Sequence, residues 1–443
     1  MKDQKILVIG LGISGRSAAE FLLKKGYTVW GVDKNYEHLQ HSSEVAVLVQ
    51  KGMQISQDSE KLDLKQFNKV VLSPGVPQTH PLCLEAHALG IEVLGEVEIA
   101  CRFLPNSPFL GITGTNGKTT VTLLVNHVLN HSGRPARALG NVGTPITSSL
   151  NGEKLDLNPI IVAELSSYQL ETMHSKVIDV AVVLNITPDH LDRYATMEEY
   201  AKAKMQIGFC LKEEGTLYVE HRTAQAYGHL LEGISYKSYG YEPSCDLYTD
   251  LQSLFFNHKN IHSLPPANVG RRSHDLENMM AAFALCHHCS VTPSEFFEAL
   301  KSFTKPHHRI EFVRCQGKVN YYDDSKGTNL DAVIRAVEAL ETPIMLIAGG
   351  VDKGAPYTPW IEAFAGKVKA IFAIGQAAPK IHMDIGHQIP VHLCSNLEAA
   401  VKRAAEYAQE GDSVLLSPGC SSFDMFRDYV HRGEEFIRIV KAL

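Results

Sequence analysis

Short apolar runs alternate with amphipathic stretches along most of the chain, and glycine-rich or polar clusters separate them. In the first hundred residues the apolar runs are 5–9, 27–32, 70–72 and 91–94. One helical pattern follows the glycine-rich segment 10–15 and runs through Lys25, and another covers 82–88. Short apolar runs bounded by turn residues are typical of buried strands, and their alternation with helices favours βαβ units. The pattern therefore predicts an α/β fold with parallel sheets.

The same alternation restarts twice, which predicts three domains, at 1–97, 98–305 and 306–443. A chain of 443 residues also exceeds what one hydrophobic core usually supports. The two predicted domain boundaries fall near proline-containing segments, Pro105 to Pro108 and Thr304 to Pro306. In the second domain we expect strands at 109–110, 160–164 and 180–185 and helices at 121–131 and 197–210. In the third we expect strands at 319–322, 344–348, 370–374 and 413–416 and helices at 330–340 and 397–409.

Composition and charge exclude several classes of protein. The 42 basic and 49 acidic residues give a net charge of −7, which offers no footprint for nucleic acid. No apolar run reaches the length of a membrane span, and the amino terminus lacks the form of a signal peptide, so we expect a cytoplasmic protein. The nine cysteines show no C-x-x-C spacing, which predicts reduced, mostly buried thiols. His287, His288 and Cys289 would point to different faces of a helix, which argues against a metal site there.

The segment 111–120, Gly-Ile-Thr-Gly-Thr-Asn-Gly-Lys-Thr-Thr, carries the strongest chemical signal. Gly111, Gly114 and Gly117 would let the backbone turn and aim N–H groups at an anion. Lys118 would add a charge for the β- and γ-phosphates, and Thr119 a hydroxyl for Mg²⁺. The spacing departs from G-x-x-x-x-G-K-[ST], because the first glycine is one position early. We predict an ATP-binding loop, with an ordinary glycine-rich turn as the alternative.

The amino-terminal segment carries a dinucleotide-type fingerprint. Gly10 to Gly15 reads G-x-G-x-x-G between a strand and a helix, and Asp33 ends the next strand. Such a unit places a diphosphate at the helix amino end, and the acidic residue accepts a ribose or base hydrogen bond. By itself this pattern indicates NAD or FAD, and a glycine turn used only for packing is the alternative. The turn Ser73 to Pro77 follows another strand, where such sheets bind ligands.

Two strands of the central domain end in groups that can bind metal ions. Glu164 ends one strand, and His190 follows the next, with Asp189 and Asp192 as reserve candidates. The carboxyl ends of neighbouring strands face the nucleotide in such a domain, so these side chains could hold Mg²⁺. Polar capping of strand ends is the alternative. Lys204 lies on a predicted helix just beyond, where a solvated lysine face is the ordinary interpretation.

Three strand-end loops of the last domain, 323–329, 349–354 and 416–424, carry lysine, threonine and serine. The first opens a helix and so offers an anion site. Together they predict a pocket for a small anionic substrate, with structural turns as the alternative for each.

These motifs in this order resemble the Mur ligases, the ATP-dependent amide-forming enzymes of peptidoglycan synthesis. The resemblance rests on 114–119, 164–167, 185–192, His308-Arg309, 324–326 and Gly349-Gly350, and it covers essentially the whole chain. It implies an N-terminal Rossmann-like UDP-binding domain, a central P-loop ATPase-type domain and a C-terminal Rossmann-like domain that binds the amino acid. The two ends, Leu11 to Gly15 and Leu415 to Phe436, are similar to the branch that adds D-glutamate, with another Mur ligase activity as the alternative.

The resemblance also implies a role for individual residues. Those that would bind ATP are Gly114, Thr115, Asn116, Gly117, Lys118, Thr119, Thr120, Asn278, Arg309 and Lys326. Those that would bind the UDP-substrate are Ile13, Ser14, Asp33, Ser73, Pro74, Gly75, Asn141 and His190. Those that would bind D-glutamate are Thr328, Lys353, Ser422 and Tyr429. The catalytic residues would be Lys118, Glu164, His190 and Lys204, and the metal ligands Thr119, Glu164, His190 and a carbamylated Lys204.

In the family, ATP phosphorylates the carboxylate of the substrate, and the amine attacks the acyl phosphate through a tetrahedral intermediate. The expected partners are UDP-N-acetylmuramoyl-L-alanine and D-glutamate, with two Mg²⁺ ions, and we expect a monomer. Two positions depart from the family pattern. The family usually has His-Asn-x-x-Asn before the helix that contacts ATP, and here the segment reads His274-Asp275-Leu276-Glu277-Asn278, so Asp275 replaces an asparagine. Tyr429 stands where a phenylalanine is common near D-glutamate.

Two rival functions belong to other classes. The amino-terminal fingerprint alone would suit a nucleotide-dependent oxidoreductase, but that leaves the loop at 111–120 and both later domains unexplained. A non-catalytic binding protein could share the same fold. The joint presence of Lys118, Glu164, His190 and Lys204 argues against it.

Overall fold

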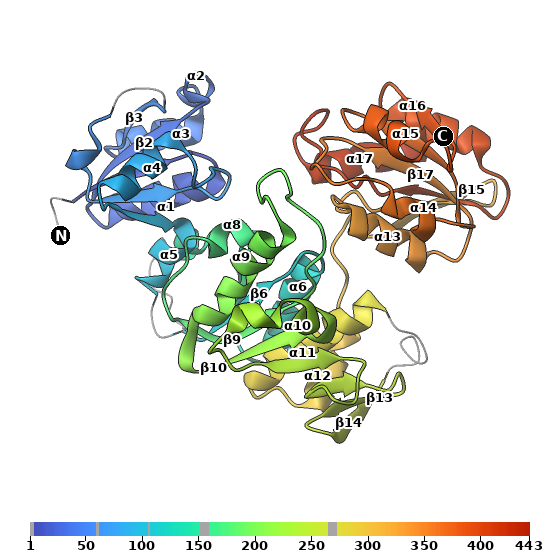
Figure 1. The fold of residues 1–443 in the computed structure, drawn as a ribbon, viewed down its shortest axis with the longest axis horizontal. Helices are drawn as coiled ribbons and strands as arrows, with labels where there is room; N and C mark the ends of the chain where they lie inside the picture. The colour runs from blue at the N-terminus through green and yellow to red at the C-terminus, as the bar shows by residue number, and fades with distance from the viewer. Residues whose placement is uncertain (1–3, 59–61, 105–106, 151–158, 265–272) are drawn as a thin grey trace. The chain divides into compact units, whose positions relative to one another are not determined.

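The computed structural model describes residues 4–58, 62–104, 107–150, 159–264 and 273–443. These residues form two compact units, 1–185 with 198–303 and 186–197 with 304–443, and each is described by itself. Three β-sheets, each with its own helices, account for the fold (Figure 1). The described part contains no helix that combines the length and apolar character needed to span a membrane.

The first sheet has the strand order β3-β2-β1-β4-β5, and all of its pairs are parallel. Its strands are β1 (Lys5–Ile9), β2 (Thr28–Asp33), β3 (Gln54–Gln57), β4 (Lys69–Leu72) and β5 (Glu92–Gly95). Its helices are α1 (Ile13–Lys24), α2 (Tyr36–Leu39), α3 (Ser43–Gln50), α4 (Pro81–Ala88) and α5 (Glu96–Cys101). The strand order reverses between β1 and β4, which is where such sheets bind ligands.

The second sheet has the order β14-β13-β12-β11-β10-β9-β6-β8-β7, and only its β12–β13 and β13–β14 pairs are antiparallel. Its first strands are β6 (Phe109–Thr113), β7 (Ala136–Gly140), β8 (Ile160–Glu164), β9 (Ile178–Val183) and β10 (Leu211–Glu220). The remaining strands are β11 (Lys237–Gly240), β12 (Leu247–Thr249), β13 (Ser253–Phe256) and β14 (Lys259–Ser263). The longer helices are α6 (Lys118–His131), α9 (Met197–Phe209), α11 (His274–His288) and α12 (Pro293–Leu300), and the shorter ones are α7 (Ile146–Ser149), α8 (Ser167–Leu170) and α10 (His221–Tyr227).

The third sheet has the order β15-β16-β20-β17-β18-β19, with only the β15–β16 pair antiparallel. Its strands are β15 (Glu311–Gln316), β16 (Val319–Asp323), β17 (Ile344–Gly349), β18 (Val368–Ile374), β19 (Val391–Leu393) and β20 (Ser413–Leu416). Its helices are α13 (Leu330–Ala339), α14 (Pro359–Ala363), α15 (Ala378–Ile385), α16 (Leu397–Tyr407) and α17 (Tyr429–Ala442). Because β20 lies between β16 and β17, the loops after these three strands leave the same edge of the sheet.

Most of the expected elements are confirmed, with ends that differ by a few residues. β8 and β20 coincide with their predicted ranges, whereas α6 begins at Lys118, three residues earlier than expected. All nine cysteines are free thiols and six of them are buried, as predicted. The expected linker at 105–108 lies partly outside the described residues, since 105 and 106 are not among them.

Candidate active site

The loop between β6 and α6 has the backbone geometry of a phosphate-binding loop. Gly117 caps α6 at φ +90°, and Gly114 has φ +149°, so both adopt conformations that favour glycine. A Cβ atom on Gly117 would clash with Oδ1 of Asn278, so this expected ATP-binding residue lies against the loop. The prediction that Gly111 lies in the turn is wrong. Gly111 lies within β6, where a Cβ would press on Ile178 and Ile207, so it serves packing.

Lys118 folds back over this loop. Its Nζ donates to the carbonyl oxygens of Gly114 and Thr115, each at 2.8 Å. Asn185, just after β9, holds the other side, because its Oδ1 accepts from the Asn116 N–H at 2.9 Å and its carbonyl from the Thr115 N–H at 2.6 Å. The ammonium group is thus positioned at the centre of the loop, where an incoming phosphate could replace the carbonyls as its partner.

Glu164 is a buried carboxylate at the end of β8, directly beside the loop-bearing strand. It pairs in register with Ile112 of β6 and is 2% exposed. Oε1 accepts from Nδ2 of Asn141 at 2.7 Å, whereas Oε2 has no hydrogen-bond partner within the described part of the chain. A buried carboxylate oxygen without a donor is costly unless a cation or another donor reaches it. Its oxygen therefore fits the coordination of a hard divalent cation. Thr119, the other expected metal ligand of this loop, is also buried.

Lys204 is buried, so the interpretation of a solvated lysine face is wrong for this residue. Its side chain on α9 is 2% exposed, and Nζ donates to the carbonyl of Gly114 at 2.7 Å. The same nitrogen lies 4.6 Å from the ring centroid of Tyr200, whose hydroxyl is 3.2 Å from Oγ1 of Thr115. The structure thus brings Lys118 and Lys204 to one carbonyl of the loop. Tyr200 was not predicted, and only its one-turn spacing from Lys204 could have indicated it.

The predicted diphosphate turn of the first sheet is assembled around two short loops. Gly10 has φ +87°, and a Cβ on Gly15 would clash with the carbonyl of Gly10, so the turn requires both glycines. Oγ of Ser73 donates to the same carbonyl at 2.7 Å, which joins the 73–75 turn to the glycine turn. Asp33 accepts from the Leu11 N–H at 2.7 Å through Oδ2.

The other residues predicted for these two turns are at least partly exposed to solvent. Ile13 is 69% exposed, Ser14 and Pro74 are half-buried, and Gly75 is exposed. The amino end of α1 has no side-chain cap. A helix amino end of this kind can bind an anion through its N–H groups.

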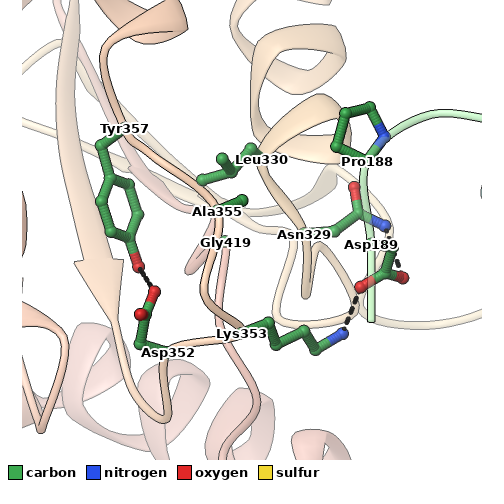
Figure 2. A pocket seen from close by; sticks show the side chains of 9 residues that line it. All are labelled: Pro188, Asp189, Asn329, Leu330, Asp352, Lys353, Ala355, Tyr357 and Gly419. Carbon is green, nitrogen blue, oxygen red and sulfur yellow. Dashed lines mark hydrogen bonds and ion pairs between the residues drawn. The ribbon is translucent and has the colours of Figure 1, made fainter. Parts of the chain in front are cut away.

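In the second unit, residues 186–197 lie against the loops of the third sheet. Lys353 and Asp189 form an ion pair, with Nζ 2.8 Å from Oδ1, and Nδ2 of Asn329 lies 3.4 Å from Oδ2 of the same carboxylate (Figure 2). His190 adopts the left-handed region at φ 58°, and its Nε2 lies 3.6 Å from Oδ2 of Asp189. Asp189, Asn329 and Lys353 help to line a pocket, whose full lining is Pro188, Asp189, Asn329, Leu330, Asp352, Lys353, Ala355, Tyr357 and Gly419.

A buried arginine that the sequence did not reveal joins two of the predicted substrate loops. Arg432 of α17 is 0% exposed and donates to Oγ and the carbonyl of Ser325 at 3.0 and 2.9 Å, and to the carbonyl of Cys420 at 3.1 Å. Burial lowers the pKa of its guanidinium to about 10, so the group remains charged at neutral pH. Its contacts hold the loops that carry Thr328 and Ser422 in one arrangement. Thr328 is half-buried and Ser422 is buried.

The predicted nucleotide residues of this unit lie on neighbouring segments. Nζ of Lys326 lies 3.7 Å from the ring centroid of Tyr429, so the tyrosine supports the lysine by a cation–π contact. Arg309 has a buried Nε for which the described residues offer no hydrogen-bond acceptor. Asp324 is buried and accepts from Oγ of Ser417 at 2.7 Å, and its burial raises the pKa of the carboxyl to about 7.

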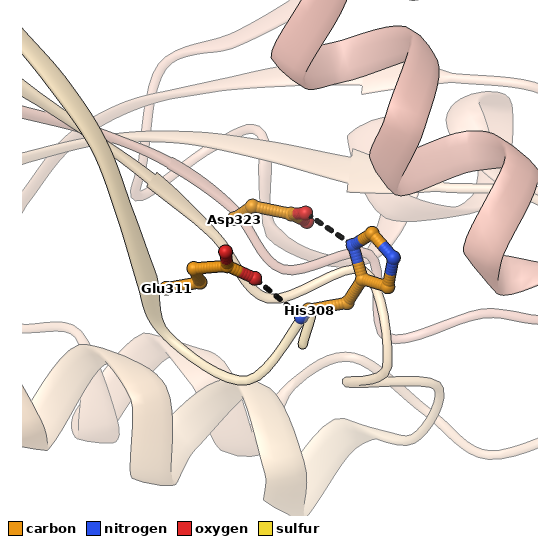
Figure 3. Close-up of side chains that lie close together, drawn as sticks. All are labelled: His308, Glu311 and Asp323. Carbon is orange, nitrogen blue, oxygen red and sulfur yellow. Dashed lines mark hydrogen bonds and ion pairs between the residues drawn. The ribbon is translucent and has the colours of Figure 1, made fainter. Parts of the chain in front are cut away.

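His308, Glu311 and Asp323 form a third polar group (Figure 3). Their ligand atoms lie within 4.8 Å of one another. Nδ1 of His308 is 2.6 Å from Oδ2 of Asp323, and Glu311 accepts from the backbone N–H of His308 at 2.9 Å. The three side chains are thus already bonded within the protein. We interpret the group as a structural ion pair that fixes the backbone just before Arg309.

The hydrogen bond to Asp323 raises the pKa of His308 above its ordinary value. We expect Asp323→Asn to lower that pKa, measured by NMR titration of the imidazole protons. Because the raised pKa belongs to the folded state, the pair stabilises this unit below the pKa of an unfolded histidine, and that stabilisation disappears as pH rises through the folded value. An unchanged titration curve in Asp323→Asn would contradict the assigned pair.

The fold and these sites define a three-domain α/β protein with a nucleotide loop on its central sheet. Family models describe three successive regions: the Mur ligase MurD-like N-terminal domain over 4–95, the Mur ligase middle domain over 112–286, and the Mur ligase glutamate ligase domain over 308–420. The chain belongs to the Mur ligase family.

Two similar proteins carry the name UDP-N-acetylmuramoylalanine–D-glutamate ligase. The one from Protochlamydia amoebophila is 54% identical over 440 residues, which are 99% of this chain and 98% of that protein. The one from Caldanaerobacter subterraneus is 36% identical over 100% of this chain and 99% of that protein.

Solved structures share the fold at lower identity. The UDP-N-acetylmuramate-alanine ligase of Thermotoga maritima has a TM-score of 0.60 at 17% identity, with 99% of both chains covered. The MurF ligase of Thermotoga maritima in complex with ADP has a TM-score of 0.62 at 16% identity, over 94% of this chain and 96% of that one. These likenesses bear on the fold, and the expected three-domain α/β architecture is confirmed.

Proposed function

We propose that this protein is an ATP-dependent ligase that joins D-glutamate to UDP-N-acetylmuramoyl-L-alanine, with release of ADP and phosphate. The observation that carries the proposal is the arrangement at Gly114, whose carbonyl accepts from both Lys118 and Lys204 while the carboxylate of Glu164 lies on the adjacent strand. An acyl-transfer site driven by ATP needs a charged cradle for the moving phosphoryl group, and this loop provides one. The names and near-complete coverage of the relatives support D-glutamate as the amino acid.

The deciding experiment measures phosphate release from ATP with each substrate omitted in turn. We expect turnover only when UDP-N-acetylmuramoyl-L-alanine and D-glutamate are both present. Substitution of D-glutamate by L-alanine, L-lysine or diaminopimelate tests the alternative of another Mur ligase activity. Turnover with one of these in place of D-glutamate would overturn the choice of amino acid and leave the ligase mechanism in place.

The proposed metal ligands are Thr119, Glu164, His190 and a carbamylated Lys204, which would hold two Mg²⁺ ions. The partnerless Oε2 of Glu164 supports this set, since it offers a hard oxygen that protein donors leave unused in the described residues. Bound Mg²⁺ would offset the negative charge of the phosphates. Lys118 would hold the β- and γ-phosphates, and Asn278, Arg309 and Lys326 would contact the nucleotide.

The proposed ligand of the first domain is the UDP group of the substrate rather than NAD. Ile13, Ser14, Asp33 and the 73–75 turn would hold the uridine and diphosphate, and Asn141 and His190 would contact the sugar-nucleotide. The joined turns at Gly10 and Ser73 support a ligand that lies across both. We also place the domain boundaries near 97 and 305, and propose a monomer that acts in the cytoplasm.

The variants Ser422→Ala and Lys353→Ala should weaken the binding of D-glutamate more than the binding of ATP. Each variant removes a hydrogen bond to a carboxylate, which costs about 1.5–3 kcal/mol, or roughly a 10- to 100-fold increase in the KM for D-glutamate. The KM for ATP should change by less than about two-fold, since neither residue is among the proposed ATP contacts. Steady-state kinetics with each substrate varied in turn provides the measurement. A larger effect on ATP would assign these loops to the nucleotide instead.

A further inference from the structure

The pocket of Figure 2 holds an acidic and a basic side chain side by side. Asp189 and Lys353 pair at 2.8 Å, and their side chains are only 7% and 15% exposed. Asp352, the other acidic residue of the lining, is engaged elsewhere. Its Oδ1 accepts from the Tyr357 hydroxyl at 2.9 Å and its Oδ2 from the Gly354 N–H at 3.2 Å. The pocket therefore presents one carboxylate and one ammonium as a matched pair.

An α-amino acid carries the same two charges on one carbon atom, an ammonium and a carboxylate. The proposed contact of Lys353 with D-glutamate accounts for the carboxylate and leaves the ammonium without a partner of opposite charge. If Asp189 remained bound to Lys353, its negative charge would compete with the substrate carboxylate for the same ammonium. If the internal pair separates, both charges gain partners of opposite sign from one ligand.

We propose that Asp189 recognises the ammonium group of the incoming amino acid, and that the zwitterion replaces the internal Asp189–Lys353 pair with two pairs of its own. The inference rests on the proposed function and adds a substrate contact to it. The position of Asp189 suits this role, because the adjacent residue is His190, the proposed contact of the UDP-substrate. The amine has to reach the activated carboxyl group of that substrate. A carboxylate next to His190 would deliver it there.

Asn329 supports the exchange from the other side. Its Nδ2 lies 3.4 Å from Oδ2 of Asp189, while its own Oδ1 accepts from the Ala332 N–H at 2.8 Å and caps α13. The amide is thus anchored on a helix and gives Asp189 a second contact when Lys353 turns to the substrate. Asp189 keeps its position without the lysine.

The test compares D-glutamate with glutarate, which is the same molecule without the ammonium group. In the wild-type enzyme, glutarate should inhibit competitively with a constant at least about 10-fold above the KM for D-glutamate. Asp189→Asn should raise the KM for D-glutamate by about 10- to 100-fold and leave the inhibition constant of glutarate unchanged or lower, because the competing carboxylate is gone. Lys353→Ala should weaken the binding of D-glutamate and of glutarate by similar factors, since both ligands offer a carboxylate to Lys353.

Asp331→Asn is the matched control. Asp331 accepts from the Thr187 hydroxyl at 3.2 Å, so this variant removes one negative charge that contacts the same segment. Asp331 is not one of the residues that line the pocket. It should change neither constant by more than about two-fold. Thermal unfolding of each variant verifies that it is folded.

Equal weakening of both ligands by Asp189→Asn would overturn the proposal and show that Asp189 only orients Lys353. A KM for D-glutamate that stays constant or falls would also overturn it, as would wild-type inhibition by glutarate at concentrations near that KM. Failure of the proposed function looks different, because the wild-type enzyme would then release no phosphate in response to D-glutamate.

Discussion

Lys118→Ala is expected to lower kcat by about 10²- to 10³-fold, the usual loss when one preorganised charge-stabilising donor is removed. The ammonium already lies at the centre of the loop, with Gly114 and Thr115 carbonyls at 2.8 Å as its partners. It can turn to the phosphates without a large rearrangement, so its contribution should appear mainly in the transition state. Phosphate release at saturating substrates provides the measurement.

The same variant should keep its affinity for the UDP-substrate, because the proposed uridine and diphosphate contacts lie on the first sheet. Isothermal titration of UDP-N-acetylmuramoyl-L-alanine into Lys118→Ala should give a dissociation constant within about three-fold of wild type, which is a difference of less than 1 kcal/mol. If a folded Lys118→Ala lost turnover and UDP-substrate binding to the same extent, the assignment of ATP and the UDP-substrate to separate sites would be wrong.

Periodicity predicted the central parallel strands well because they are continuous apolar runs bounded by turn residues. β8 and β20 have the predicted bounds, and their residues are buried on both faces of a sheet. The strands β12, β13 and β14, at one end of the second sheet, were not predicted. They are three to five residues long and mix polar with apolar side chains, so they carry little period-two signal.

The sequence indicated site residues that stand at strand ends and in glycine turns, because their chemistry follows from local order. It missed Tyr200 and Arg432, whose roles depend on contacts with distant segments. Arg432 joins Ser325 to Cys420 across two loops, and no local spacing predicts that. Gly111 shows the opposite error, since a glycine used for packing inside β6 was assigned to a turn.

Lys204→Ala should be folded and should lose about 10²- to 10³-fold of kcat. Oxygen ligands suit Mg²⁺, whereas a protonated lysine among metal ligands would be repelled. Two metal ions next to this buried side chain would favour the neutral amine, and a neutral amine can capture CO2 to become a carbamate. Acetate or formate should restore part of the rate in Lys204→Ala by placing a carboxylate in the vacated space. Lys204→Arg should not respond, because its guanidinium fills that space with the opposite charge.

Lys202→Ala is the matched control, since Lys202 lies on the same helix α9 and is exposed. It should keep full activity and show no response to acetate. A readout independent of turnover is ¹³C NMR in the presence of ¹³C-bicarbonate. The wild-type and Lys202→Ala proteins should show a protein-bound carbamate resonance that is missing in Lys204→Ala. Full activity of Lys204→Ala, or an identical carbamate resonance in all three proteins, would exclude the carbamate at Lys204, while the role of Lys118 in ATP-dependent ligation would be unaffected.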